Sequence, residues 1–221
     1  MTASPRRRPR RRSATLPRGV WWLVLLVGLL PAAWLAARTA GFLGGLGTNP
    51  IERLLIESGT IAMITLLSAL GVTPLRRLTG LAAITRLRRM IGLLAFGYVT
   101  LHFLVWLGVD LFFDVSLILD DLTQRPYVMA GFAAWVILLL LASTSTDRAV
   151  RMLKRNWSRL HRMVYVAGVL AVIHVIWLTR ADYREATIYA LVLLVLLGSR
   201  LVWTVVQRRK VRGEPARNGV T

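Results

Sequence analysis

Three histidines are the residues of this chain best suited to redox chemistry. They are His102, His161 and His174, and the 221-residue chain has no others. Each falls within or at the edge of an apolar stretch, where polar side chains are rare and usually functional. At about 1.5 Å per helical residue, His102 and His174 lie roughly 10 Å and 6 Å from the same end of their spans. Two imidazoles at matched depth can supply both axial ligands of a haem, although an intramembrane histidine can also serve only as an interhelical hydrogen-bond donor.

His161 has a different position and leaves two interpretations open. It precedes His174 by 13 residues, which is about 20 Å along a helix and a rotation of about 140°. It is therefore either an interfacial structural histidine or part of a second cofactor site, for which Gly168 on the same face would leave room. Nearby arginines either set the topology or pair with haem propionates or a flavin phosphate. These arginines are Arg86, Arg88, Arg89, Arg155 and Arg159.

The elements that position the histidines are apolar blocks of membrane-spanning length. The chain is 56% hydrophobic and 18% charged, whereas soluble domains are about 45–50% apolar and 25% charged. The blocks predict an all-α, polytopic bundle of about six transmembrane helices. Their expected ranges are 20–37, 58–72, 91–109, 127–142, 161–178 and 187–206. The second range is short for a span, and Ile51, Leu54 and Leu55 suggest that its helix starts earlier.

Charge alternates along the polar segments between these blocks. The segments before the first span and after the second, fourth and sixth carry 7, 5, 5 and 5 Lys/Arg, and the other three carry 2, 1 and 2. Eight of the ten acids fall on those three. This is the positive-inside pattern, which predicts that both termini are cytoplasmic. Residues 1–19 and 207–221 then form basic cytoplasmic tails that attract anionic lipid. The net charge of +19 thus has a membrane explanation and does not indicate nucleic acid.

Several function classes lack their signatures. With no cysteine, the chain cannot hold iron–sulfur clusters or covalent c-type haem. It has no Gly-rich dinucleotide fingerprint and no P-loop lysine. The predicted spans contain no Asp or Glu, which argues against a transporter, and a pure scaffold would leave the histidines unexplained. A cytochrome b anchor of another respiratory or ferric reductase remains an alternative, although three histidines fall short of two bis-histidine sites.

Several segments in order resemble the MsrQ (YedZ) family of ferric reductase-like transmembrane proteins. They are RLRRMIGLLAFGYVTLH ending at His102, TQRPYVMAGFAAWVILLLLASTST at 123–146 and NWSRLHRMVYVAGVLAVIHVIW at 156–177, with NPIERLLIESG at 49–59 and TPLRRLTG at 73–80. The likeness covers roughly residues 20–205, and the family's haem-region histidines correspond to His102, His161 and His174.

The resemblance implies a membrane electron-transfer subunit of the bacterial inner membrane. Such a subunit takes electrons from the quinone pool or a cytosolic flavin reductase and passes them through haem b, with FMN as a further cofactor. The acceptor is a periplasmic molybdopterin enzyme, MsrP, which reduces methionine sulfoxide in envelope proteins. Under this reading His102 and His174 bind the haem iron, and His161 belongs to the cofactor-binding residues.

Overall fold

The chain folds as a bundle of long helices. The computed structural model describes residues 17–80 and 84–213, without the side chains of residues 85, 86 and 208–213, and it has no strand in this part of the chain. Six helical stretches are long and apolar enough to cross a membrane, which confirms the predicted number of spans. They contain α1 (Arg18–Thr39), α2 (Pro50–Thr79), α3 (Ile84–Leu104) continued by the π-helix η1 (Val105–Asp110), α5 (Pro126–Ser143), α8 (Val164–Leu178) and α9 (Arg184–Gly213).

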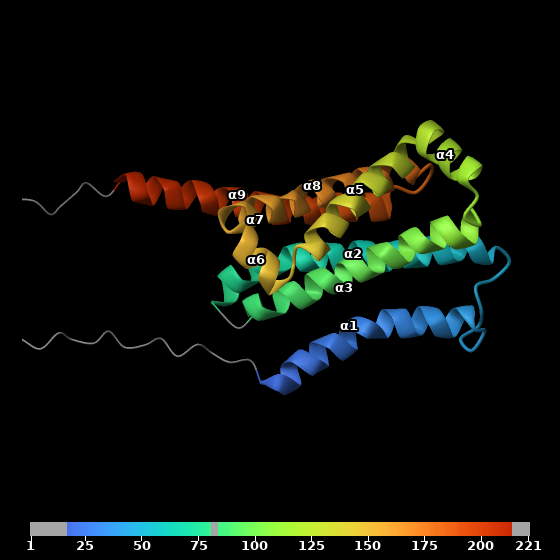
Figure 1. Ribbon diagram of the computed structural model, residues 1–221, viewed down its shortest axis with the longest axis horizontal. Helices are drawn as coiled ribbons and strands as arrows, with labels where there is room; N and C mark the ends of the chain where they lie inside the picture. The colour runs from blue at the N-terminus through green and yellow to red at the C-terminus, as the bar shows by residue number, and fades with distance from the viewer. Residues whose placement is uncertain (1–16, 81–83, 214–221) are drawn as a thin grey trace, which may run out of the picture.

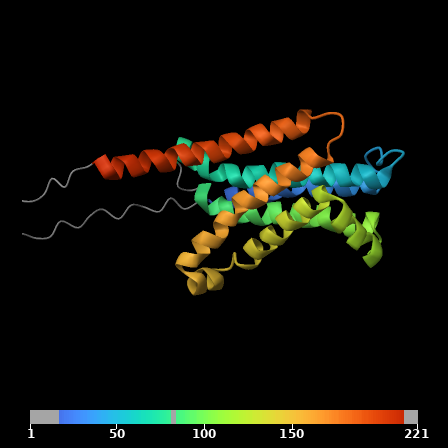
Figure 2. The same ribbon diagram turned by 90° about the horizontal axis from the view of Figure 1, so that it is seen from above.

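Four of these helices form a ring that positions the histidines. Helix α2 packs on α3, α3 on α5, α5 on α8 and α8 on α2. Helices α3 and α8 therefore face each other across the ring instead of packing side by side. Helix α1 lies outside the ring against α2 and α3, and α9 lies against α2 and α8 (Figures 1 and 2).

The two ends of the bundle differ in charge and in their connections. Helix α1 begins and α9 ends at the same end, which also holds the short helices α6 (Asp147–Leu153) and α7 (Arg155–Leu160) (Figure 1). We call this the basic end, because the arginine-rich segments meet there. Helix α4 (Val115–Gln124) lies at the other end, which we call the acidic end. The arrangement fits an even number of crossings, and the cytoplasmic location of the basic end remains a prediction.

Local chemistry explains where the spans begin and end. Asn49 accepts a hydrogen bond from the Glu52 amide at the start of α2, where Pro50 occupies the first helical turn. Both features favour a helix start, so α2 extends the short predicted range as expected. Gly80 ends α2 with a φ of 70°, a conformation in which glycine avoids a steric penalty. Pro126 starts α5 in the same manner as Pro50, and the preceding segment forms α4 instead of lengthening the fourth span.

Helix α1 is fastened to α3 by one tyrosine. The Tyr98 hydroxyl donates to the Gly28 carbonyl at 2.5 Å and accepts from the Ala32 amide at 3.2 Å. It thereby bonds to the amide and the carbonyl that would pair with each other in a regular helix, one residue after Pro31, a proline inside α1. An inserted side chain and a proline are both causes of helix bending. Tyr98 thus points to α1, although it lies only about one helical turn from His102.

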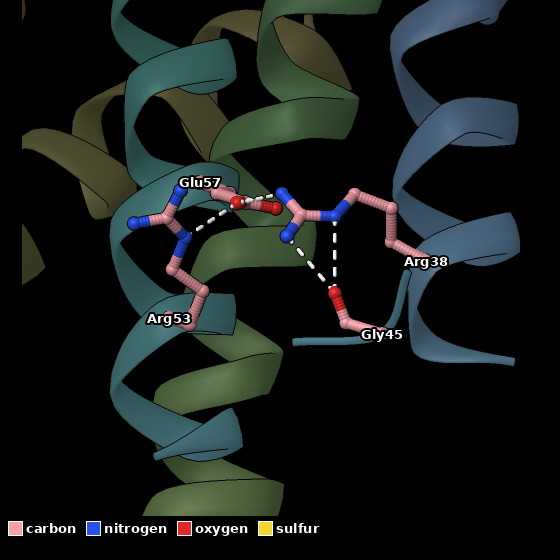
Figure 3. Close-up of polar contacts among 4 residues, drawn as sticks. All are labelled: Arg38, Gly45, Arg53 and Glu57. Atoms are coloured by element: carbon pink, nitrogen blue, oxygen red, sulfur yellow. Dashed lines mark hydrogen bonds and ion pairs between the residues drawn. The ribbon is translucent and has the colours of Figure 1, made fainter. Parts of the chain in front are cut away.

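A buried carboxylate joins α1, the following loop and α2 at the acidic end. Glu57 accepts from Arg38, and from Arg53 Nε at 2.7 Å, while Arg38 also donates to the Gly45 carbonyl at 2.9 Å (Figure 3). Glu57 lies inside the spanning helix α2 and is buried. The prediction that the spans lack acidic residues is therefore wrong for α2, because that helix starts earlier than its apolar core. The two guanidinium groups make this burial tolerable.

Candidate functional site

His102 and His174 meet in the middle of the helix ring. His102 is on α3 and His174 is on α8, yet their ring centroids lie only 6.3 Å apart, with the ring planes at 73°. The two helices lie on opposite sides of the helix ring, and the two histidine side chains extend toward each other across the space between the backbones. This confirms that the two histidines share one depth.

His174 is held by a backbone carbonyl. Its Nδ1 lies 2.7 Å from the carbonyl oxygen of Tyr127, in the first turn of α5. A carbonyl can only accept, so Nδ1 carries the proton and the Nε2 lone pair is left for another partner. This fixes both the tautomer and the orientation of the ring.

His102 is held in a similar way by a hydroxyl. Its Nδ1 lies 3.1 Å from Ser58 Oγ on α2, and Ser58 donates its own proton to the Leu55 carbonyl at 3.1 Å. The hydroxyl therefore accepts from Nδ1–H of His102. No hydrogen bond joins either Nε2 to another of the described residues, so both histidines present a free lone pair.

The separation of the rings suits one metal ion between them. A bond from a histidine nitrogen to a metal is about 2 Å long, and a ring nitrogen lies about 1.1 Å from its centroid. Two opposed imidazoles on one metal therefore have centroids roughly 6 Å apart. In residues 17–80 and 84–213 no group of three or more His, Cys, Asp or Glu gathers to hold a metal. A two-histidine site of this kind fits haem iron, whose other four ligands are porphyrin nitrogens.

Two glycines give the rings their space. A Cβ added to Gly131 on α5 would lie 2.8 Å from His174 Nδ1, and one added to Gly59 on α2 would lie 3.1 Å from His102 Cε1. Alanine at Gly131 would force the His174 ring to move. Neither glycine was identified from the sequence, nor were Ser58 and the Tyr127 carbonyl. The available signal was that glycine inside a helix costs about 1 kcal/mol relative to alanine and so needs a packing reason.

An apolar cluster closes the ring on the basic side of the histidines. Ala95 and Ala167 each precede their histidine by seven residues, roughly 10 Å along the helix. Both are buried in one cluster with Leu66, Leu138 and Leu141. Ala167 therefore leaves no room for a macrocycle, because the three leucines cover it.

Aromatic rings gather around Phe103, the residue that follows His102. Phe103 stacks on Trp135 at 4.1 Å between centroids and lies 5.7 Å from Trp106. Trp106 donates to the buried carboxylate of Asp121 on α4, at 3.2 Å. Trp106 thereby connects the π-helical end of the span to α4, and π-helical segments are frequent near functional sites.

His161 does not join the other two histidines. It starts the 3-10 turn η2 (His161–Met163) at the basic end, where its ring stacks on Trp157 at 4.0 Å. Its Nε2 lies 3.4 Å from Ser145 Oγ, and its buried Nδ1 has no hydrogen-bond partner in the described part of the chain. Gly168 leaves no room for a planar group, since a Cβ there would meet Leu70 at 3.0 Å. Of the arginines expected nearby, Arg88 interacts electrostatically with His161 and Arg89 pairs with Asp147, while the side chain of Arg86 lies outside the described residues.

The family model and the relatives that match this chain belong to the same group of membrane proteins. Residues 58–172 match the family described as ferric reductase like transmembrane component, a range that holds His102 and His161 and ends just before His174. A "Protein-methionine-sulfoxide reductase heme-binding subunit MsrQ" of Ralstonia nicotianae is 45% identical over 82% of this chain and 83% of its own. The MsrQ of Bordetella pertussis is 45% identical over 81% and 87%, and that of Caulobacter vibrioides is 40% identical over 94% and 96%.

The extent of these matches decides the family. No solved structure gives a significant match, so the assignment rests on the sequence relatives, and each of these aligns over more than four fifths of both chains. Together with six helices able to span a membrane, they show a multi-pass membrane protein consistent with a bacterial inner membrane. The chain belongs to the MsrQ family, within the ferric reductase-like transmembrane components.

Proposed function

We propose that this chain is the membrane electron-transfer subunit of a protein-methionine-sulfoxide reductase system and binds one b-type haem between His102 and His174. The observation that carries the proposal is the pair of imidazoles whose ring centroids lie 6.3 Å apart, with both Nδ1 atoms hydrogen-bonded within the protein. The names of the relatives, which describe a heme-binding subunit, support it.

The residues of the chain fix the ligands before a haem arrives. Tyr127 and Ser58 accept the Nδ1 protons, so each imidazole can bind iron through Nε2 without losing a proton. Such outer hydrogen bonds also raise the basicity of the ligating nitrogen. Haem iron, when bound, supplies one-electron transfer through its ferric and ferrous states. The cluster around Leu66, Leu138 and Leu141 keeps water from the basic side of the site.

The electron donor is proposed to be membrane quinol or a cytosolic flavin reductase, with FMN as a cofactor on the grounds of the family resemblance. A cavity of about 520 Å³ between α1 and α3 supports access by an apolar donor. Its walls include Trp21, Leu25, Leu93 and Tyr98. Tyr98 is four residues from His102, which is about one helical turn, so a quinol in this cavity would lie beside the helix that carries the ligand.

His161 is proposed to act at the basic end, in electron entry or at a second cofactor. Its buried and unpartnered Nδ1 supports a role beyond packing, since buried polar atoms are normally hydrogen-bonded. Replacement of His161 by alanine should then slow reduction by the donor more than it lowers the haem content.

The electron acceptor is proposed to be a periplasmic MsrP-like molybdopterin reductase. The acidic end of the bundle carries no catalytic domain within the described residues, and its polar segments hold 8 acids against 5 Lys/Arg. A small excess of this kind guides the approach of a partner more than it sets affinity. A ferric reductase activity is the second candidate, favoured by the family whose model matches residues 58–172.

Reconstitution in vesicles of known orientation tests both the direction and the acceptor. We expect quinol or reduced flavin to reduce the haem, and an MsrP-type enzyme added at the acidic end to reoxidise it while consuming methionine sulfoxide. The chain alone should show no sulfoxide reduction. Reoxidation only by enzyme added at the basic end would contradict the direction. Reoxidation by a ferric chelate but not by a competent MsrP-type enzyme would favour the second candidate.

A further inference from the structure

Four arginines from four separate segments converge at the basic end of the bundle. Arg77 is in the last turns of α2, Arg88 is in the first turns of α3, Arg162 is in η2 and Arg200 is in α9. The other three guanidinium groups lie close enough to Arg200 to interact with it electrostatically. Arg77 and Arg200 are half-buried, whereas Arg88 and Arg162 are exposed. We call these four residues the arginine cluster. Its two half-buried members form the floor of the cluster, and its two exposed members form the rim.

The two arginines of the floor are held in place by aromatic rings. The guanidinium of Arg200 lies 4.5 Å from the centroid of Tyr165 on α8, and that of Arg77 lies 5.1 Å from the centroid of Trp203 on α9. Trp203 follows Arg200 by three residues, so both project from one face of α9. Contacts of this kind favour a cation over the ring face. They orient the floor of the cluster without neutralising its charge.

No carboxylate among the described residues balances the arginine cluster. In the described residues, Asp147 is the only acid at the basic end, and it pairs with Arg89 at 2.8 Å. None of the four arginines forms an ion pair with another described residue. Like charges at close range repel, and the effect is larger away from bulk water. Arginines that serve only to set topology need to lie near the lipid headgroups, but they have no need to converge.

We propose that the arginine cluster is a binding site for a phosphate group, carried either by an anionic phospholipid or by a soluble phosphate ester. The planar guanidinium matches the oxygens of phosphate in a two-pronged hydrogen bond, so Arg is the preferred residue for such groups. A phosphate brings the negative charge that the described residues lack, and the exposed rim gives it access. The site lies at the basic end of the bundle, near the ends of helices long enough to span a membrane. It is separate from His102 and His174, so the proposal does not depend on haem binding.

The double variant Arg77→Gln/Arg200→Gln tests the site in the full-length protein. Its matched control is Arg76→Gln/Arg151→Gln, which removes two charges from the same end of the bundle outside the cluster. Melting temperatures are measured in detergent, in chloride and in inorganic phosphate at equal ionic strength. We expect phosphate to stabilise the wild type and the control, with binding weakened at least about tenfold in the double variant, as the loss of charged hydrogen bonds requires. In chloride the double variant should melt no lower than the wild type, because it is relieved of repulsion.

Nanodiscs distinguish the two sources of phosphate. Protein in phosphatidylcholine discs is compared with protein in discs that also contain phosphatidylglycerol. Stabilisation by phosphatidylglycerol, with no further gain from inorganic phosphate, identifies a lipid site. Stabilisation by inorganic phosphate in both kinds of disc identifies a soluble ligand. If the double variant folds poorly, the rim variant Arg162→Gln replaces it. An equal response of cluster and control variants, or a wild type that responds to neither phosphate nor phosphatidylglycerol, would overturn the proposal.

Discussion

At the scale of single residues, the positions of the His102 and His174 rings depend on small neighbouring groups. Ser58 and the carbonyl of Tyr127 orient the imidazoles, and Gly59 and Gly131 leave the space in which the rings turn inward. A histidine in a membrane helix without these neighbours would satisfy its hydrogen bonds elsewhere. The free lone pairs on His102 and His174 therefore depend on four other positions in the helices, two of which contribute only a missing methyl group.

The substitution Gly131→Ala tests this dependence. The new methyl would lie 2.8 Å from Nδ1 of His174, so the ring must shift and its bond to the Tyr127 carbonyl must lengthen. We expect haem affinity to fall by about 10–100-fold, the usual cost of disturbing an outer hydrogen bond of a metal ligand. Haem content after purification, measured by absorbance per protein, provides the measurement. Gly92→Ala is the control, because no atom lies within 4 Å of its added Cβ, and an equal loss in both variants would contradict the explanation.

At the scale of secondary-structure elements, α1 is held less tightly than the four helices of the ring. Leu35 is its only buried residue among those described. Its main polar contacts with the other helices are the hydrogen bonds of the Tyr98 hydroxyl to Gly28 and Ala32 and the ion pair between Arg38 and Glu57. Hydrogen exchange in α1 should therefore respond to changes on α3 and α2.

Removal of the Tyr98 hydroxyl is expected to loosen α1 alone. In Tyr98→Phe the helix can restore its own Ala32–Gly28 hydrogen bond, so the cost in free energy of unfolding should be about 1 kcal/mol. Amide exchange should become faster in α1 and stay unchanged in α2 and α5, as followed by mass spectrometry. Tyr183→Phe, at an exposed position in the α8–α9 connection, is the control. Unchanged exchange in α1 would show that the tyrosine is not its main attachment.

The spans and the paired histidines could be predicted because each depends on local rules. Apolar length gives a helix in a membrane, and the helical rise gives the common depth of His102 and His174. The partners of those histidines could not be predicted, since Ser58 and Tyr127 come from helices whose rotation depends on packing. Glu57 was misplaced for a related reason, because two arginines allow a carboxylate where hydropathy alone would exclude it. Helix α4 was missed because its ten residues are too short for a span and too polar to read as core.

At the scale of the whole molecule, the orientation of the bundle is open to direct measurement. The chain has no cysteine, so a single introduced cysteine reacts without background. Phe42 lies in the α1–α2 connection at the acidic end, and Met152 lies in α6 at the basic end; both are well exposed. In intact spheroplasts, Phe42→Cys should react with a membrane-impermeant maleimide, and Met152→Cys should react only after lysis. The reverse pattern would place both termini outside and would reverse the direction of electron flow.

The pairing of His102 with His174 on one haem is the claim from which the rest of the electron path follows. Its most direct test is the reduced-minus-oxidised absorption spectrum of purified wild type, His102→Ala, His174→Ala and His161→Ala proteins, with membrane insertion checked in parallel. We predict a low-spin b-type spectrum in the wild type, loss of most haem in both the His102 and His174 variants, and retention of that haem in the His161 variant. A full low-spin spectrum in both His102→Ala and His174→Ala would contradict this pairing.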